Sequence, residues 1–325
     1  IKGPYLEEPQ LKEILSEVSP HITDLQVEDN NIILEVKRSE LASVVSKISR
    51  TAFLRTMIAS DERSTGGVFS LYYVFGFDER GVNVIIKVPL PADDPTVDSL
   101  ADVVKALDWY EAEAQDLMGI KFRGRPGEKF VLPDDWPSDV YPLRKDVDMG
   151  QLKKLYAPKL VEHAKEVGAE EVYRIPIGPY HPALHEPEYF ELYVRGEKIV
   201  DARYVGFMVH RGIEKLAESM KYDQVPFLAE RICGICGFVH STSYVQAVER
   251  ALRIDVPERA EFIRSVVLEV ERIHSHLLWF GVALHLLGYD TGFMHAWRIR
   301  EKVMVLAEKL TGSRKTYGIN LVGGV

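Results

Sequence analysis

Cysteine is nearly absent from this chain of 325 residues. Its only two cysteines, Cys233 and Cys236, belong to one Cys-x-x-Cys motif. Small disulfide-stabilised folds use more cysteines and spread them along the chain. We therefore expect a protein of a reducing, cytosolic setting, in which the pair serves a metal or redox site.

Long apolar runs and an excess of positive charge are also missing. The longest apolar stretch, residues 277–288, is interrupted by His285 and is too short to cross a bilayer. The start of the chain does not have the pattern of a signal peptide. The net charge of −9 argues against nucleic acid as a partner, because nucleic-acid-binding domains usually carry a basic face. It argues equally against direct binding to anionic lipid.

Both ends of the sequence suggest that further residues adjoin it. The chain begins at Ile1 rather than at methionine, and it stops at Gly323, Gly324 and Val325, a turn-like sequence. We expect residues to be missing at both ends, with the C-terminal break inside a continuing motif.

The first 145 residues mix strand and helix patterns. Residues 25–36 predict two short strands around a turn, and residues 68–77 and 82–88 predict a hairpin. Residues 40–48 have the apolar spacing of a helix. These patterns, together with a proline- and glycine-rich tail, predict an α+β domain over residues 1–145.

Within this first domain, Ser99 and Asp102 predict the cap of a helix that runs to about Met118. Helices dominate the expectations for the remainder of the chain. Asp255 predicts the cap of a long helix with Pro257 in its first turn.

Beyond Leu277 that long helix is apolar on most sides, which predicts deep burial. A second helix is expected over residues 294–310. The charged segment 146–171 predicts a linker helix, and residues 175–200 predict short strands with a hairpin at Arg195-Gly196. The fold class is therefore an α+β domain followed, from residue 172 to 325, by a mainly α-helical domain with a short N-terminal sheet.

The chemistry is concentrated in residues 230–240. Two thiolates three residues apart, Cys233 and Cys236, can bind one soft metal centre from a single turn. Neighbouring glycines allow close approach of the backbone, and His240, four residues after Cys236, can reach back toward the thiols. The motif alone leaves three alternatives open: a redox dithiol, a zinc site completed by His210 and His240, and two inert core cysteines.

The longer sequence around the motif is more specific. Arg231, Cys233, Cys236 and His240 resemble the N-terminal metal-binding signature of [NiFe]-hydrogenase large subunits. Across residues 172–325 the chain resembles the hydrogenase-related large subunit of complex I and of the group 4 membrane-bound hydrogenases, in segments 178–186, 209–215, 256–260 and 276–279.

The first half has a resemblance of its own. Segments 93–97, 109–120 and 141–146 look like the small α+β subunit that packs beside that large subunit in complex I. Fusion of the two is typical of the large subunit of formate hydrogenlyase and similar membrane-bound hydrogenases.

Within this family some members make or oxidise H₂ and others reduce quinone. In the quinone-reducing relatives the two cysteine positions usually hold Asp and Ser, and a quinone-contacting Tyr falls where this chain has Gly234. His185 matches the other quinone-contacting residue. On balance the residues favour a metal site, with a sulfur- or quinone-reducing complex I-like enzyme as the alternative.

The resemblance implies a role for each site residue. Cys233 would be a terminal nickel ligand and Cys236 a bridging ligand of a NiFe centre with CO and cyanide on iron, at which H₂ is split or formed heterolytically. Arg231 and His240 would contact this cofactor, and Glu186 would relay protons. Without the motif, Glu186 would be interpreted as a surface carboxylate. His274 is expected to be a core histidine, and His210 and Arg211 to be structural or at a subunit interface.

A complete centre needs four thiolates, and this chain supplies two of them. We expect the second pair beyond Val325, with a separate chain or a degenerate site as alternatives. Since two cysteines cannot hold a cluster as well as nickel, an iron–sulfur small subunit and a ferredoxin-like subunit are expected partners. Integral membrane subunits would place the protein peripherally on the cytoplasmic side of the membrane.

Overall fold

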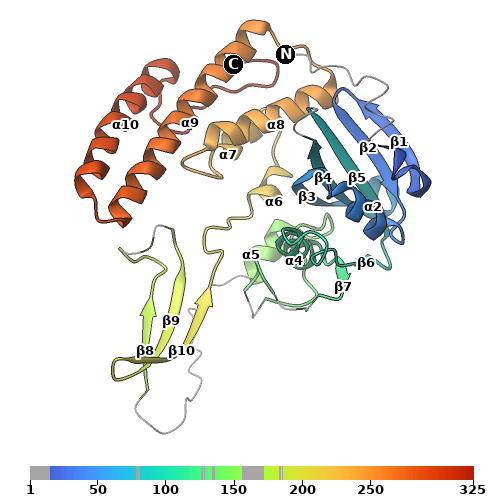
Figure 1. Cartoon of the computed structure of the whole chain (residues 1–325), viewed down its shortest axis with the longest axis horizontal. Coiled ribbons are helices and arrows are strands. Elements are labelled where there is room, and N and C mark those ends of the chain that lie inside the picture. Colours follow the sequence, from blue (N-terminus) through green and yellow to red (C-terminus); the bar gives the residue numbers. More distant parts are fainter. Residues whose placement is uncertain are drawn as a thin grey trace. The chain divides into compact units, whose positions relative to one another are not determined.

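The structure is a computed structural model that describes residues 15–77, 81–125, 127, 129–133, 136–155, 172–182, 184 and 186–325. The chain divides into two compact units, Ile1–Val209 and His210–Val325. Figure 1 colours both along the sequence.

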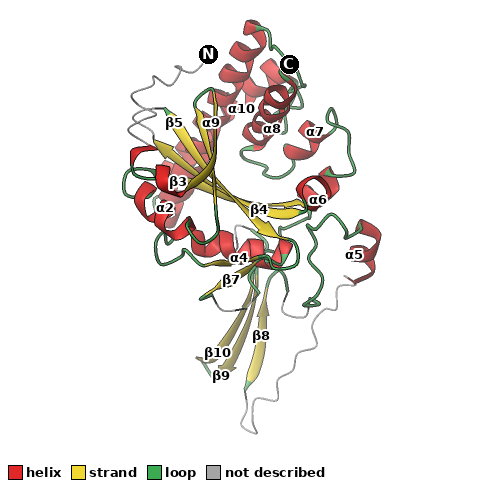
Figure 2. Ribbon diagram, turned by 90° about the vertical axis from the view of Figure 1, so that its right-hand side faces the viewer, coloured by secondary structure: helices red, strands yellow, loops and turns green. Residues whose placement is uncertain are grey.

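A twisted sheet is the framework of the N-terminal unit (Figures 1 and 2). Its five described strands lie in the order β1-β2-β5-β4-β3. Neighbouring strands are antiparallel except β2 and β5, which are parallel. The strands are β1 (Ile22–Glu28), β2 (Asn31–Val36), β3 (Phe53–Glu62), β4 (Val68–Phe77) and β5 (Val82–Pro91). The two expected hairpins, β1–β2 and β4–β5, are thus confirmed.

Short elements surround this sheet. They are the 3₁₀ helix η1 (Ser19–His21), α3 (Arg63–Gly66), the parallel pair β6 (Thr96–Asp98) and β7 (Lys121–Arg123), and α5 (Met149–Leu155). The helix α5 lies inside the expected linker, whose residues 156–171 are outside the described part. The expected boundaries at 145/146 and 171/172 therefore stay predictions.

The helix α4 spans Leu107–Met118, so the expected start at Ser99 and Asp102 is wrong. Residues 101–106 form turns instead. The Ser99 hydroxyl donates to the buried carboxylate of Glu111 at 2.6 Å, and the Leu100 amide donates to the same carboxylate at 2.7 Å. Ser99 therefore positions Glu111 rather than capping a helix.

The tail after α4 is attached to the unit by a second buried carboxylate. Asp116 accepts hydrogen bonds from the backbone amides of Phe130, Val131 and Leu132, at 2.7, 2.7 and 3.2 Å. Further along, Arg144 Nε donates to the carbonyl oxygen of Met118 at 2.7 Å. These contacts give the proline-rich segment a defined path although it contains little regular structure.

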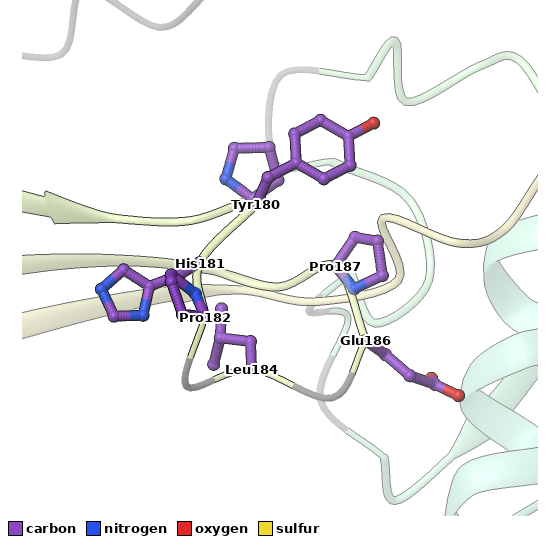
Figure 3. A pocket seen from close by; sticks show the side chains of 7 residues that line it. Tyr180, His181, Pro182, Leu184, Glu186 and Pro187 are labelled. Carbon is purple, nitrogen blue, oxygen red and sulfur yellow. The ribbon is translucent and has the colours of Figure 1, made fainter.

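A three-stranded antiparallel sheet, in the order β10-β9-β8, follows. Its strands are β8 (Tyr173–Ile177), β9 (Tyr189–Arg195) and β10 (Lys198–Val205). The expected hairpin at Arg195-Gly196 joins β9 to β10, with Gly196 at a φ of +59°. The connection between β8 and β9 carries Glu186 (Figure 3).

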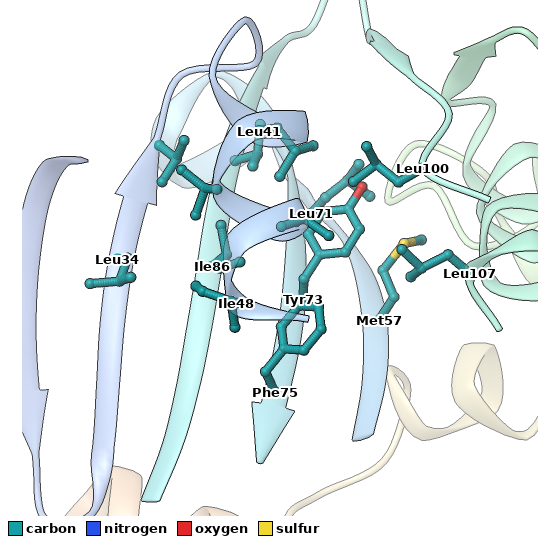
Figure 4. Packing of buried hydrophobic residues seen from close by; sticks show 14 of the residues in the cluster. Leu34, Leu41, Ile48, Met57, Leu71, Tyr73, Phe75, Ile86, Leu100 and Leu107 are labelled. Carbon is teal, nitrogen blue, oxygen red and sulfur yellow. The ribbon is translucent and has the colours of Figure 1, made fainter. Parts of the chain in front are cut away.

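The hydrophobic core of the N-terminal unit lies between the sheet and its helices (Figure 4). The helix α2 (Leu41–Ile48) buries all four apolar residues that predicted it, Leu41, Val44, Val45 and Ile48. Alternate residues of β2 and β5 are buried beneath it. The apolar faces of the strands, with a period of two residues, and of the helix, with a period of 3.6, thus pack together in one core.

Helices make up most of the C-terminal unit. They are α6 (Ile213–Ala217), α7 (Val225–Ala229), α8 (Gly237–Leu252), α9 (Glu258–Leu286) and α10 (Asp290–Thr311). The expected cap of α9 is wrong, because Pro257 rather than Asp255 is its N-cap residue and no side chain caps it. The expected second helix is α10, which Gly312 ends as its C-cap residue at a φ of +82°.

The far end of α9 is more exposed than its composition predicts. Val267, Val270 and His274 are buried, but Trp279 and Leu286 are each 72% exposed. The helix packs mainly against α10, which covers one side only, so deep burial beyond Leu277 is wrong for the described residues. Among these residues, no helix combines the length and apolar character needed to cross a membrane.

Candidate metal centre

The loop between α7 and α8 carries both cysteines. The helix α7 ends at Ala229, and α8 begins at Gly237 with Cys236 as its N-cap residue. A Cβ atom added to Gly237 would meet the carbonyl oxygen of Glu230 at 2.6 Å. The loop therefore closes on itself at a position that only glycine can occupy without movement.

Backbone amides of this loop point at the first thiol. Cys233 Sγ accepts hydrogen bonds from the amides of Ile235, at 3.4 Å, and Cys236, at 3.3 Å. Burial raises the pKa of the Cys233 thiol, but the hydrogen bonds from Cys236 and Ile235 outweigh this effect, so the pKa lies below its ordinary value. Burial, reinforced by Cys233, raises the pKa of the Cys236 thiol to about 11. Cys233 is therefore the first of the pair to become a thiolate, the form that binds metal.

His240 lies beside the second thiol, with 3.6 Å between its Nε2 and Cys236 Sγ. The spacing of four residues on α8 brings the two side chains onto one face of the helix. The guanidinium of Arg231, in the loop, is turned back toward α7, because Nη1 donates to the carbonyl oxygen of Phe227 at 2.7 Å. The structure thus joins His240 to the pair directly, whereas Arg231 reaches it only through the loop backbone.

Two buried carboxylates that the sequence patterns did not single out hold this loop. Glu230 accepts two contacts from the Gly318 amide, at 3.0 and 2.9 Å, and one from the Ser241 hydroxyl at 3.3 Å. Burial raises the pKa of Glu230 above its ordinary value. Glu271 of α9 accepts from the amides of Phe238 and Val239, at 2.9 and 3.0 Å. In the sequence, Glu230 and Glu271 are visible only as acidic residues among apolar neighbours. Because that pattern is common on helix surfaces, it did not predict a buried role for either residue.

Arg211 has the structural role expected for it. Its Nη2 donates to the carbonyl oxygens of Arg231 and of Ile232, the latter at 3.3 Å. Arg211 therefore holds the backbone of the two residues just before Cys233.

Glu186 lies in the N-terminal unit, on the connection between β8 and β9. Its carboxylate is exposed and lines an open pocket together with Tyr180, His181, Leu184 and neighbouring prolines. Figure 3 shows its side chain extending in the opposite direction from that of His181. His185 is outside the described residues. Because Glu186 and the cysteines belong to different compact units, the proton-relay role stays a prediction.

The donor set suits one half of a soft-metal site. Thiolates and imidazole are ligands that nickel and iron accept, and the two thiols and His240 lie in one loop and one helical turn. No group of three or more His, Cys, Asp or Glu side chains placed to bind a metal occurs among the residues described. A complete four-thiolate centre therefore needs two further ligands.

Two protein families match separate parts of the chain. Residues 34–153 match the family described as respiratory-chain NADH dehydrogenase, 30 Kd subunit. Residues 211–313 match the family described as nickel-dependent hydrogenase. The second match begins at Arg211 and includes the whole cysteine loop.

Curated relatives contain both parts in one polypeptide. The chain is 45% identical over 307 residues to formate hydrogenlyase subunit 5 of Escherichia coli, an alignment that covers 91% of this chain and 53% of that protein. It is 44% identical over 304 residues to hydrogenase-4 component G of the same organism, covering 90% and 54%. Identity to the C/D subunit of NADH-quinone oxidoreductase from Phocaeicola vulgatus is 31% over 291 residues, covering 84% and 55%.

The chain spans about half the length of these relatives. The order of the two family matches agrees with the order of the sheet-based and helical units. The chain therefore belongs to the family of group 4 [NiFe]-hydrogenase large subunits in which a part related to the complex I 30 kDa subunit is fused to a hydrogenase large-subunit part.

Proposed function

We propose that this chain is the catalytic large subunit of a membrane-bound [NiFe]-hydrogenase of the formate hydrogenlyase type, which forms or oxidises H₂. The observation that carries the proposal is the pair of thiols in an amide-lined loop beside His240, inside the segment that matches the nickel-dependent hydrogenase family.

Cys233 and Cys236 would hold a NiFe centre with CO and cyanide ligands, together with two thiolates from elsewhere. When bound, this centre would supply the heterolytic redox chemistry of H₂. The residues of this chain prepare the ligands. The amides of Ile235 and Cys236 stabilise the thiolate of Cys233, and His240 supports the sulfur of Cys236.

Protons need a path between such a centre and water, and we assign Glu186 to it. The carboxylate is exposed, so it can exchange protons directly with solvent.

Reduction of quinone or of sulfur compounds is the alternative function, and it has less support. The hydrogenase relatives are 45% and 44% identical, against 31% for the quinone-linked relative. At Gly234, where quinone-reducing relatives carry a Tyr, an added Cβ would have nothing within 4 Å. This chain therefore has no ring at that position.

Partners follow from the chemistry. Both cysteines of these 325 residues are assigned to the NiFe centre, so any clusters that carry its electrons would be held outside these residues. We propose an iron–sulfur small subunit and a ferredoxin-like subunit as electron carriers. Integral membrane subunits would hold this chain peripherally on the cytoplasmic side of the membrane.

The cysteine assignment is tested in the intact complex by Cys233→Ser, with nickel content and the infrared bands of CO and cyanide as readouts. We expect nickel, the infrared bands and H₂ turnover to be lost together. A wild-type complex that turns over without nickel would disprove the proposal.

The relay assignment is tested by Glu186→Gln, with Glu197→Gln in the exposed β9–β10 turn as the matched control. We expect Glu186→Gln to slow H₂ turnover by about 10²-fold or more, since a positioned proton carrier contributes on that scale, while nickel content stays normal. If Glu197→Gln slowed turnover equally, the assignment of Glu186 would be wrong.

A further inference from the structure

The peptide unit between Ile235 and Cys236 has hydrogen bonds on both of its sides. Its N–H, which belongs to Cys236, donates to Cys233 Sγ at 3.3 Å. Its C=O, which belongs to Ile235, accepts from two side chains. A trans peptide is planar, with N–H and C=O pointing in opposite directions, so whatever holds the carbonyl also aims the amide.

The two groups that hold the carbonyl come from distant parts of the sequence. His274 Nε2, on α9, lies 3.1 Å from the Ile235 oxygen. Lys315 Nζ, in the segment after α10, lies 2.9 Å from the same oxygen and 2.7 Å from His274 Nε2. Both nitrogens therefore converge on one oxygen atom.

Arg300 of α10 sets the orientation of the histidine ring. Its Nε donates to His274 Nδ1 at 3.1 Å. A neutral imidazole has one acceptor nitrogen and one N–H donor, so Nδ1 is the acceptor here and Nε2–H is the donor that faces the Ile235 oxygen. Nε2 cannot then also accept from Lys315, so the 2.7 Å between these two nitrogens is the approach of two donors that share the Ile235 oxygen. Burial, with Lys315 and Arg300 nearby, lowers the pKa of His274 to about 4, which keeps the ring neutral.

We infer that Lys315 and His274 are positioning residues for the metal-ligand loop: by holding the Ile235 carbonyl, they fix the Cys236 amide against the sulfur of Cys233. Donors on the carbonyl polarise the peptide, which strengthens its N–H as a donor. This inference rests on the proposed function in treating Cys233 as a metal ligand. The hydrogen-bonding arrangement itself does not depend on that function.

The test uses the full-length protein prepared without nickel, and it has two readouts. Hydrogen–deuterium exchange at the Cys236 amide reports the peptide orientation, and the affinity for Ni²⁺, measured against a competing chelator, reports the ligand geometry. The variants are Lys315→Met, which removes the charged donor, Lys315→Gln, which shortens it, and Lys315→Arg, which keeps it. Lys302→Met, on the exposed face of α10, is the matched control.

We expect Lys315→Met to accelerate exchange at Cys236 about tenfold and to weaken Ni²⁺ binding by a similar factor, the scale of one lost hydrogen bond to a charged group. Lys315→Gln should act in the same direction, and Lys315→Arg should restore most of the protection. Amides within α9 and α10 should exchange at wild-type rates in every variant.

Unchanged exchange at Cys236 in both Lys315→Met and Lys315→Gln would overturn the inference. So would an equal effect of Lys302→Met, because it would show a general loss of stability. Since neither readout requires H₂ turnover, a failure here is distinguishable from a failure of the proposed hydrogenase function.

Discussion

Arg264 of α9 and Glu249 of α8 form a two-pronged ion pair, with nitrogen–oxygen distances of 2.9 and 2.7 Å and side chains only 4% and 6% exposed. Arg264 also donates to the carbonyl oxygens of Leu321 and Gly324, at 2.8 Å each, and Glu249 accepts from the Gly323 amide at 2.7 Å. Through these hydrogen bonds the pair holds residues 321–324 against α8 and α9.

Glu249→Gln should destabilise the C-terminal unit by about 3–5 kcal/mol, because removing one partner leaves a buried guanidinium without its counter-charge. Urea unfolding followed by circular dichroism measures the change. Arg314 and Glu301 form a similar two-pronged pair, at 2.8 Å twice, with 45% and 56% exposure. Glu301→Gln should cost about 0–1 kcal/mol, and equal losses in the two variants would contradict the argument from burial.

Glu271→Gln should weaken the start of α8. The helix has no side-chain cap at Cys236, and the Glu271 carboxylate accepts the amides of Phe238 and Val239 in its place. An amide group offers one acceptor and would place a donor against the second N–H. We expect a loss of about 1.5–3 kcal/mol and reduced nickel content in the complex, since Cys236 adjoins this turn.

Thermal unfolding and metal analysis measure both effects of Glu271→Gln. The control is Glu269→Gln, two residues earlier on α9, where the carboxylate is 61% exposed and pairs at 3.2 Å with Arg272, which is 63% exposed. If Glu269→Gln were as destabilising, the hydrogen bonds to α8 could not be the cause.

Asp61 should make the N-terminal unit sensitive to acid. Hydrogen bonding from Arg63, supported by the Lys145 amide, outweighs burial and lowers the Asp61 pKa from 3.8 to about 2. A carboxylate with a depressed folded-state pKa stabilises the fold above its unfolded pKa, and this contribution is lost as the pH falls from about 4 to about 2. It corresponds to about 2 kcal/mol.

Urea unfolding of the wild type and of Asp61→Asn across this pH range tests the contribution. The wild type should be the more stable by about 2 kcal/mol near neutral pH, and the difference should shrink toward the acid end. A difference that stayed constant with pH would mean that the ionisation of Asp61 does not contribute.

Gly119→Ala should be much more costly than Gly67→Ala, although both glycines have a φ of +71°. At Gly119 an added Cβ would meet Arg144 Nη2 at 2.5 Å and Tyr141 Cε2 at 2.7 Å, whereas at Gly67 it would have nothing within 4 Å. Gly67→Ala should cost about 1 kcal/mol, the backbone penalty alone. Gly119→Ala adds overpacking of about 1–3 kcal/mol, and equal midpoints of thermal unfolding would exclude that added cost.

Local patterns in the sequence correctly predicted structural features that involve only residues close together in the chain. The apolar spacing of residues 41–48 predicted α2, and the i, i+4 relation between Cys236 and His240 predicted their contact. The expected caps at Ser99 and Asp255 were wrong because a capping pattern does not specify which backbone amides lie nearby. In the structure, the hydroxyl of Ser99 is bonded to Glu111 instead.

The supports of the cysteine loop could not be predicted in the same way. Glu230 bonds to Gly318, and Lys315 to Ile235, across 88 and 80 positions of the sequence. Such pairs depend on how the helices pack against one another. A single sequence contains no repeating pattern from which that packing could be predicted. Buried charges of this kind are visible only once their partners are placed.

The strand β5 pairs with one antiparallel neighbour, β4, and one parallel neighbour, β2, and this affects how the N-terminal unit can fold. With β4 it forms a hairpin of adjacent segments, as β1 does with β2. The parallel seam between β2 and β5 instead joins residues 31–35 to residues 83–87. Closing that long loop costs more chain entropy than closing either hairpin. Two hairpins that form early and separately, and then dock along a single late seam, are therefore the folding route that this strand order favours.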